Sequence, residues 1–106
     1  MAGKAYLVVR ASVADPADRE PFDRWYATEH LPDAMKAFGV KRAWRTWSRV
    51  EPDAHIAYYE FDDIAHARAG TAPERLGALI AEFDRVWQNR VVRSRDIQET
   101  VEERQV

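Results

Sequence analysis

The sequence predicts an α+β protein with a ferredoxin-like protomer, in which two helices cover one face of a four-stranded antiparallel sheet. Two observations predict it. Strand-like and helix-like segments follow one another in the order β-α-β-β-α-β, and apolar residues occupy both faces of the expected sheet. The 106 residues fit a single domain that spans the whole chain, residues 1–106.

The first strand is expected at residues 5–13, where β-branched and aromatic side chains are frequent and a proline-containing loop follows. A helix then begins near Asp15 or Asp18, whose carboxylate can accept from an unpaired backbone N–H of the first turn. Pro32 is expected to break or kink this helix, and a further turn ends at Gly39. One helix face has members at steps of three and four: Phe22, Trp25, Tyr26, Glu29 and His30.

The remaining elements are expected to be a hairpin of two strands, a helix in two pieces and a last strand. The two strands are expected at residues 40–50 and 55–61, and the first piece of the helix at residues 64–69, which stops at residues 70–73. The second piece follows this break, and the last strand is expected at residues 91–101. The second piece of the helix has one apolar face: Leu76, Leu79, Ile80, Phe83 and Trp87. Residues 102–106 are expected to fray.

Alternation along the strands divides their large side chains into two sets, one for each face of the sheet. One set is Tyr6, Val8, Trp44, Tyr58 and Ile97. The other is Leu7, Val9, Ala57, Tyr59 and Phe61. Because the helices cover only one face, the other is left apolar, and such a patch is rarely open to water on a monomer. We therefore expect a homodimer with facing sheets, or a ligand on that face.

Composition argues against several classes of partner and site. With 16 Lys+Arg against 18 Asp+Glu, the chain lacks the basic surplus of a nucleic-acid binder. It has no cysteine, which excludes disulfides and thiol catalysis and is compatible with a cytoplasmic location. No metal-ligand motif and no glycine-rich phosphate loop occurs, so neither a metal nor a cofactor is expected. The N-terminal apolar run is too short for a membrane span.

Residues 22–32 contain the densest cluster of side chains that can perform chemistry. Tyr26 and His30 lie four positions apart, which places them on the same helical face. A histidine beside a phenol can donate or take a proton, and the phenol can stabilise an oxyanion. Both are candidate catalytic residues. The alternative is a core histidine with Tyr26 packed beside it.

The pattern Y-x-x-x-H-x-P at residues 26–32, with FGV at 38–40 and RAWR at 42–45, resembles the dimeric α+β barrel superfamily. The nearest branch is that of the EthD-like proteins and their methylmuconolactone-isomerase relatives. The resemblance implies a homodimer closed by facing sheets, with a cleft between sheet and helices for a small cyclic organic molecule. In those isomerases a histidine of the first helix acts with polar residues on the central strands. His30 matches that histidine, and His55 is a looser match and a third catalytic candidate.

Large aromatic side chains with a polar edge suit a pocket for a planar ligand. Four residues are candidates for lining such a pocket: Trp44, Trp25, Trp47 and Tyr58. Trp44 is the first choice and Trp25 the second. The alternative is that they fill a core and a dimer interface.

Arg45 is a further substrate-binding candidate, because a guanidinium in an apolar cavity can hold a carboxylate by two hydrogen bonds. The arginines near residues 41–49 and 90–95 can also be explained as solvated sheet edges, which we favour. Arg10 interrupts an apolar strand and needs a partner, for which Glu60 is a candidate. A histidine exposed at a strand end is the alternative for His55.

Together these features predict a cofactor-independent enzyme that acts by acid–base chemistry on a small cyclic organic metabolite. Its reaction would be that of an isomerase, cyclase, dehydratase or cofactor-free oxygenase, with His30 as the proton shuttle and Tyr26 orienting it. The alternative is a non-catalytic dimer that binds a small ligand, or a stress-responsive barrel protein. A third option is haem handling through His30, because related barrels bind haem through a histidine.

Overall fold

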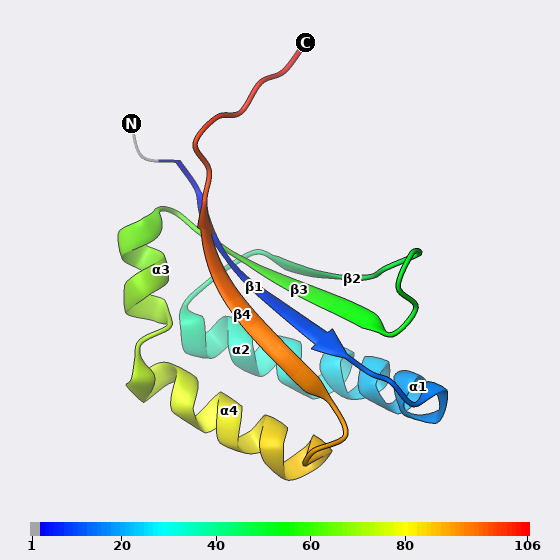
Figure 1. The fold of residues 1–106 in the computed structure, drawn as a ribbon. Coiled ribbons are helices and arrows are strands. Elements are labelled where there is room, and N and C mark those ends of the chain that lie inside the picture. The colour runs from blue at the N-terminus through cyan, green and yellow to red at the C-terminus, as the bar shows by residue number, and fades with distance from the viewer. Residues whose placement is uncertain (1–2) are drawn as a thin grey trace.

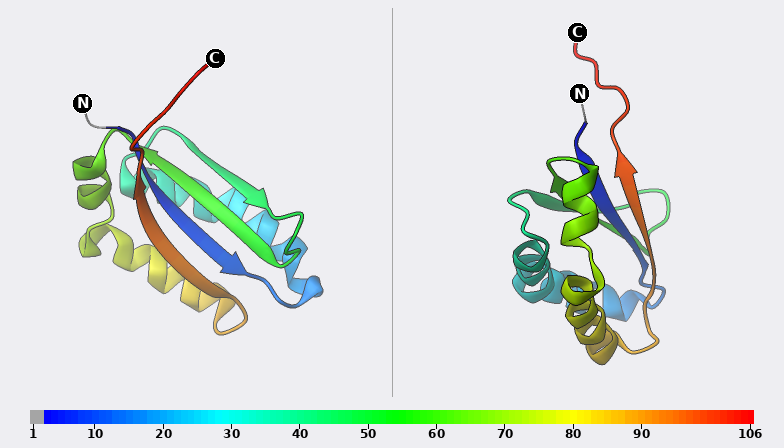
Figure 2. Two further views of the ribbon diagram at one scale, coloured as in Figure 1. Left: turned by 45° about the horizontal axis from the view of Figure 1, so that its top comes forward. Right: turned by 90° about the vertical axis from the view of Figure 1, so that its left-hand side faces the viewer.

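A computed structural model describes residues 3–106. Its four strands form one sheet, with every neighbouring pair antiparallel, in the spatial order β2-β3-β1-β4. The strands are β1 (Ala5–Ser12), β2 (Ala43–Trp47), β3 (Ala54–Phe61) and β4 (Val92–Glu99). The helices cover one face of this sheet (Figures 1 and 2). The structure therefore confirms the ferredoxin-like α+β arrangement. No helix of residues 3–106 has the length and apolarity needed to cross a membrane.

Two helical regions pack on the sheet, and each is divided into segments. These are α1 (Pro16–Trp25), the π-helical turn η1 (Tyr26–His30) and α2 (Leu31–Phe38), then α3 (Ile64–Gly70) and α4 (Pro73–Trp87). Asp15 caps α1 as expected, since its carboxylate accepts from the Ala17 N–H at 3.0 Å. Asp63 caps α3 in the same way, accepting from the His66 N–H at 2.8 Å.

Pro32 does not break the first helical region, and the break was one of the two outcomes expected for it. The chain stays helical from α1 through α2, and the backbone N–H of Leu31 bonds the carbonyl of Tyr26, five residues back. A π turn is wider than an α turn, so it accommodates the proline ring and its missing N–H without ending the helix. Gly39 then ends α2 at a φ of 70°, in the left-handed region.

Strand register decides which side chains face the helices. Leu7 lies opposite Tyr59 on one side and opposite Ile97 on the other, so these three share the helix-facing side. Ile97 was expected on the opposite face, and that assignment is wrong. The opposite face, here the outer face, has a partly buried apolar centre: Tyr6, Val8, Trp44, Ile56 and Tyr58.

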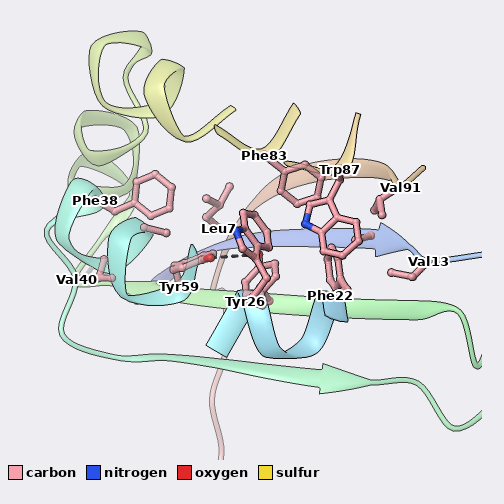
Figure 3. Close-up of a cluster of buried hydrophobic side chains, with 14 of the residues drawn as sticks. Leu7, Val13, Phe22, Tyr26, Phe38, Val40, Tyr59, Phe83, Trp87 and Val91 are labelled. Carbon is pink, nitrogen blue, oxygen red and sulfur yellow. Dashed lines mark hydrogen bonds between the residues drawn. The ribbon is translucent and has the colours of Figure 1, made fainter. Parts of the chain in front are cut away.

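The core between sheet and helices is largely aromatic (Figure 3). Phe22 lies at its centre, with ring centroids 5.1 Å from His55, 5.1 Å from Trp87 and 5.4 Å from Tyr26. Large rings bury much apolar surface at little loss of side-chain freedom, so this cluster anchors α1 and α4 to the sheet.

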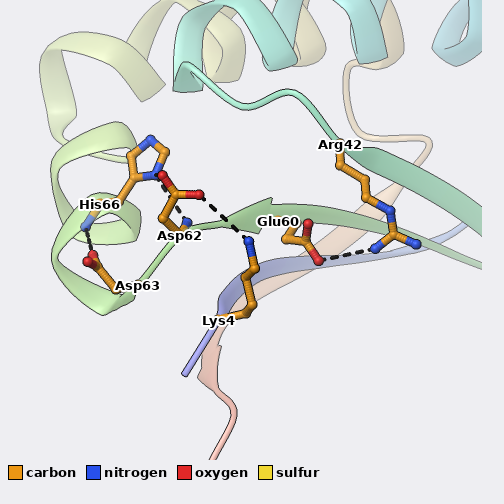
Figure 4. A network of polar contacts seen from close by, with 6 residues as sticks. All are labelled: Lys4, Arg42, Glu60, Asp62, Asp63 and His66. Atoms are coloured by element: carbon orange, nitrogen blue, oxygen red, sulfur yellow. Dashed lines mark hydrogen bonds and ion pairs between the residues drawn. The ribbon is translucent and has the colours of Figure 1, made fainter. Parts of the chain in front are cut away.

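The charged residues near the start of β1 form a surface network (Figure 4). Arg42 pairs with Glu60 at 3.1 Å, and the backbone N–H of Asp62 donates to Nδ1 of His66 at 3.2 Å. Glu60 is therefore not the partner of Arg10, which pairs instead with Glu51 in the β2–β3 turn. The network lies at the edge of the core, where the His66 ring meets the Phe61 ring edge-on with centroids 5.0 Å apart.

Candidate functional site

His30, the last residue of η1, is packed among aromatic rings. Its imidazole stacks on Trp25, with centroids 4.6 Å apart and an interplanar angle of 18°, and it meets Tyr26 edge-on at 4.8 Å. Phe83 of α4 lies 5.6 Å away on another side. Neither ring nitrogen of His30 forms a hydrogen bond within residues 3–106. The ring is therefore held in place by packing, and its nitrogens are unused.

The His30 ring lines a pocket between α4 and the helix-facing side of the sheet. The other polar side chains that line it are Tyr59, Arg93 and Arg95, and the rest of the lining is aliphatic or phenyl. Its free space in the single chain is about 20 Å³, enough for one water molecule.

A wider hollow of about 460 Å³ adjoins this pocket between α4 and β4. The two spaces share Leu7, Leu76 and Arg95 as lining residues. The hollow is more open to solvent, so it forms the approach to the pocket beside His30.

Burial lowers the pKa of His30 to about 4, and the positive charge of Arg93 acts in the same direction, with Glu82 opposing. The imidazole is therefore neutral at pH 7. A neutral imidazole with an unbonded nitrogen has a lone pair free to accept a proton.

His55 on β3 is fully buried, so it is not the exposed strand-end histidine of the alternative interpretation. Nη1 of Arg45 lies 3.2 Å from its Nε2. Burial lowers the pKa of His55 to about 4, and Arg45 also lowers it. Nδ1 of His55 has no hydrogen-bond partner among the described residues.

Asp23 of α1 joins this second histidine to the helix. Its Oδ1 accepts from Trp47 Nε1 at 2.9 Å and from Arg45 Nη1 at 3.0 Å. The hydrogen bond from Trp47 is the main cause that lowers the pKa of Asp23, and burial opposes it. Arg45 therefore bridges the Asp23 carboxylate and the His55 ring, which ties β2 and β3 to α1.

The phenol oxygens of Tyr26 and Tyr59 lie 3.3 Å apart in the core (Figure 3). Burial raises the pKa of Tyr26 to about 12 and that of Tyr59 well above its usual range. Both phenols therefore keep their protons at neutral pH. They can act as hydrogen-bond donors to a developing oxyanion, whereas they cannot act as bases.

The structure places the substrate-binding candidates in three locations. Trp25 lies beneath His30 in the core. Trp47 and Arg45 face the helices, but both bond to Asp23 and neither lines the pocket. Trp44 and Tyr58 stack on each other on the outer face, with centroids 5.3 Å apart, on the opposite side of the sheet from His30.

The pocket also contains residues that were not candidates from the sequence. Tyr59 was assigned only to an apolar face, and the arginines near residues 90–95 were attributed mainly to a solvated edge. Arg93 is in fact only 14% exposed in its side chain, and it reaches the pocket with Arg95. The signal that identifies them is the register of β4 on β1, which sequence alone does not provide.

Comparisons with known proteins support the fold. No protein-family model matches the chain, and no curated protein matches it. An EthD family protein from Bacillus halodurans is 16% identical, with a TM-score of 0.70, over 92% of this chain and 99% of that chain. An antibiotic biosynthesis monooxygenase-like protein from Bordetella bronchiseptica is 15% identical, with a TM-score of 0.70, over 93% and 98%.

SnoaB from Streptomyces nogalater, a cofactor-independent oxygenase, is a third similar structure. It is 17% identical, with a TM-score of 0.57, over 95% of this chain and 96% of that chain. At such identities the similarity shows the fold and does not transfer an activity. It supports the ferredoxin-like protomer fold: over more than nine-tenths of its length the chain has the fold of these three solved structures, among them an EthD family protein.

Proposed function

We propose that this protein is a cofactor-independent enzyme that acts by acid–base chemistry on a small cyclic organic metabolite. The observation that carries the proposal is the His30 imidazole, which is neutral and unbonded and lines a mostly apolar pocket. An apolar pocket with a few convergent polar groups is typical of small-molecule sites.

In this proposal His30 takes a proton from the bound ring and returns it at another position or to a leaving group. Charge that develops on a substrate oxygen is stabilised by the Tyr59 phenol, which lines the pocket and lies 3.3 Å from the Tyr26 phenol. Tyr26 orients His30 through the edge contact of their rings. His55 lies behind Tyr26, with ring centroids 4.6 Å apart, and acts as a positioning residue.

A ring-sized substrate needs more room than the single chain offers beside His30. We expect α4 to shift away from β4, so that the pocket joins the adjacent hollow. Of the α4 side chains that line the pocket, Leu76, Leu79 and Ile80 are only partly buried, whereas Phe83 belongs to the core. Gly77 in the interior of α4 lowers its helical stability. Both features make α4 the element that can move at least cost.

A homodimer and a cytoplasmic location are part of the same proposal. The apolar centre of the outer face, which includes Trp44 and Tyr58, is partly exposed in the single chain. A second sheet packed on it would remove this surface from water. Of the reaction types considered, cofactor-free oxygenation is supported by the description of SnoaB, and isomerisation, cyclisation and dehydration use the same proton transfers.

The alternative proposal is a non-catalytic protein that binds a small ligand, including a stress-responsive one. The observation that favours it is that Arg45 bonds to both His55 and Asp23, which leaves His30 as the one histidine among the catalytic candidates, in the described residues, with neither ring nitrogen bonded. Haem binding through His30 has less support, because the free volume of about 20 Å³ beside His30 is far smaller than the volume of a haem.

The test begins with a thermal-shift screen of cyclic acids, lactones and hydroxylated aromatic compounds. A ligand at 100 times its Kd stabilises the folded protein by ~2.7 kcal/mol. For a compound that is turned over, His30→Ala should lower kcat by about 10²–10⁴-fold while binding persists. His66→Ala, in the surface network, is the matched control and should keep the wild-type kcat. Full activity in His30→Ala contradicts the catalytic proposal, and binding without turnover of any screened compound favours the alternative.

A further inference from the structure

The pocket beside His30 has an unbalanced charge. Arg93 and Arg95 lie two positions apart on β4, opposite Ala11 and Val9, so both face the helices. Both line the pocket, and no carboxylate does. An apolar pocket that presents two cations and no anion favours an occupant of negative charge.

Arg93 is poorly solvated and incompletely paired. Its side chain is 14% exposed, and its guanidinium carbon lies 3.8 Å from the ring centroid of Phe83. Its one ion pair within the described residues joins Nη2 to Oδ1 of Asp84 at 3.3 Å, and the Asp84 side chain is 65% exposed. An arginine that only prevented edge pairing would be solvated, so the edge interpretation does not account for Arg93.

Arg95 stands where the pocket and the hollow meet, because it lines both. No carboxylate of residues 3–106 pairs with it. Arg95 is exposed, so an anion that enters from the hollow can reach its guanidinium, although Asp96 also lines the hollow.

We propose that the pocket binds a small cyclic carboxylate, and that Arg93 and Arg95 select it over neutral rings of the same shape. The guanidinium plane offers parallel N–H donors that match the two oxygens of a carboxylate. The apolar lining from α4 and β1 receives the ring. This inference rests on the proposed function, since it names the substrate class of the same site.

A bound carboxylate also changes the histidine. The groups that act on the charge of His30 are Arg93, which lowers its pKa, and Glu82, which raises it, while His55 lies further back in the core. An anion beside Arg93 offsets the guanidinium charge, which is the smaller of the two causes that lower the pKa of His30, and so raises that pKa while burial continues to lower it. Substrate binding would thus make His30 a stronger base.

The experiment compares ring carboxylates with their primary amides, which have nearly the same shape and no charge. Benzoate with benzamide, and cyclohexanecarboxylate with its amide, are titrated into the full chain while the NMR signals of the His30 ring are followed. We expect each carboxylate to bind at least about tenfold more tightly than its amide. Arg93→Gln and Arg95→Gln should each remove most of that preference, and Arg95→Lys should keep part of it. Arg68→Gln on α3 removes the same charge at an exposed site and should change nothing.

The outcomes separate this inference from the proposed function. If amides bind as tightly as acids at His30, or if the glutamine variants keep the preference, selection by the arginines is contradicted while the pocket stands. If no ring of either kind shifts the His30 signals, both the inference and the proposed site are contradicted. If Arg68→Gln weakens the preference for acids as much as Arg95→Gln does, the preference comes from the general charge of the protein, and the inference is overturned.

Discussion

The guanidinium of Arg45 donates a hydrogen bond of 3.2 Å from Nη1 to Nε2 of His55. Arginine has no acceptor atom, so Nε2 must carry the lone pair. With its pKa lowered to about 4, the ring is neutral at pH 7 and its single proton lies on Nδ1. That buried N–H lacks a partner in residues 3–106, so the core retains a polar atom that favours unfolding.

Replacing Arg45 with methionine should therefore destabilise the fold. Arg45→Met keeps most of the side-chain volume, but it leaves Nε2 of the fully buried His55 without its hydrogen-bond donor. It also leaves the partly buried Asp23 carboxylate without its cation. We expect a loss of about 2 kcal/mol in the free energy of unfolding by urea. Arg42→Met is the control, because its ion pair with Glu60 is exposed at the arginine, and it should cost less than about 1 kcal/mol. Equal losses in the two variants would contradict a structural role for the Arg45 bridge.

The two buried histidines predict a loss of stability in mild acid. The unfolded state binds a proton on each near pH 6.5, whereas in the folded state each pKa is about 4, so stability falls as pH drops through this window. Between pH 7.5 and pH 5 each histidine should contribute a loss of about 2 kcal/mol. His30→Gln should halve the loss of unfolding free energy that the two histidines cause between pH 7.5 and pH 5. Urea unfolding at both pH values measures this loss. A variant whose pH dependence equals that of the wild type would show that His30 is not protected from protonation.

Gly77 predicts a stabilising substitution. It lies in the interior of α4, and a Cβ atom built there meets nothing within 4 Å. Gly77→Ala should raise the free energy of unfolding by about 0.5–1 kcal/mol. If opening of α4 admits the substrate, the same variant should also slow ligand association in stopped-flow measurements. A stabilised variant with unchanged association would separate helix stability from pocket opening.

The outer face of the sheet predicts self-association. The wild-type chain should sediment as a dimer at micromolar concentration, because Val8, Trp44 and Tyr58 would otherwise stay partly in contact with water. Val8→Glu should give a folded monomer. Val50→Glu places the same charge at a valine that is 89% exposed outside this face, and should remain a dimer. A folded monomer in the wild type would contradict the facing-sheet dimer.

The sequence was enough to predict the element order and to narrow the first helix cap to Asp15 or Asp18, since both depend on local patterns. The sequence placed Ile97 on the wrong face of the sheet. Which face a β4 side chain occupies depends on the register of β4 with β1, a strand far away in the sequence. The continuous helix past Pro32 was missed because a π turn has no distinct sequence signature. The Asp23–Arg45–His55 bridge joins three elements that only the tertiary fold brings together.

The measurement that tests the account most directly is the NMR titration of the His30 imidazole in the free protein. In the proposed mechanism this ring lies neutral and unbonded in a desolvated pocket, ready to accept a proton. We expect its carbon-bound ring protons to titrate with a pKa of about 4 in the folded chain. A titration near the ordinary histidine value of 6.5 in the folded protein would show a solvated ring and contradict the claim.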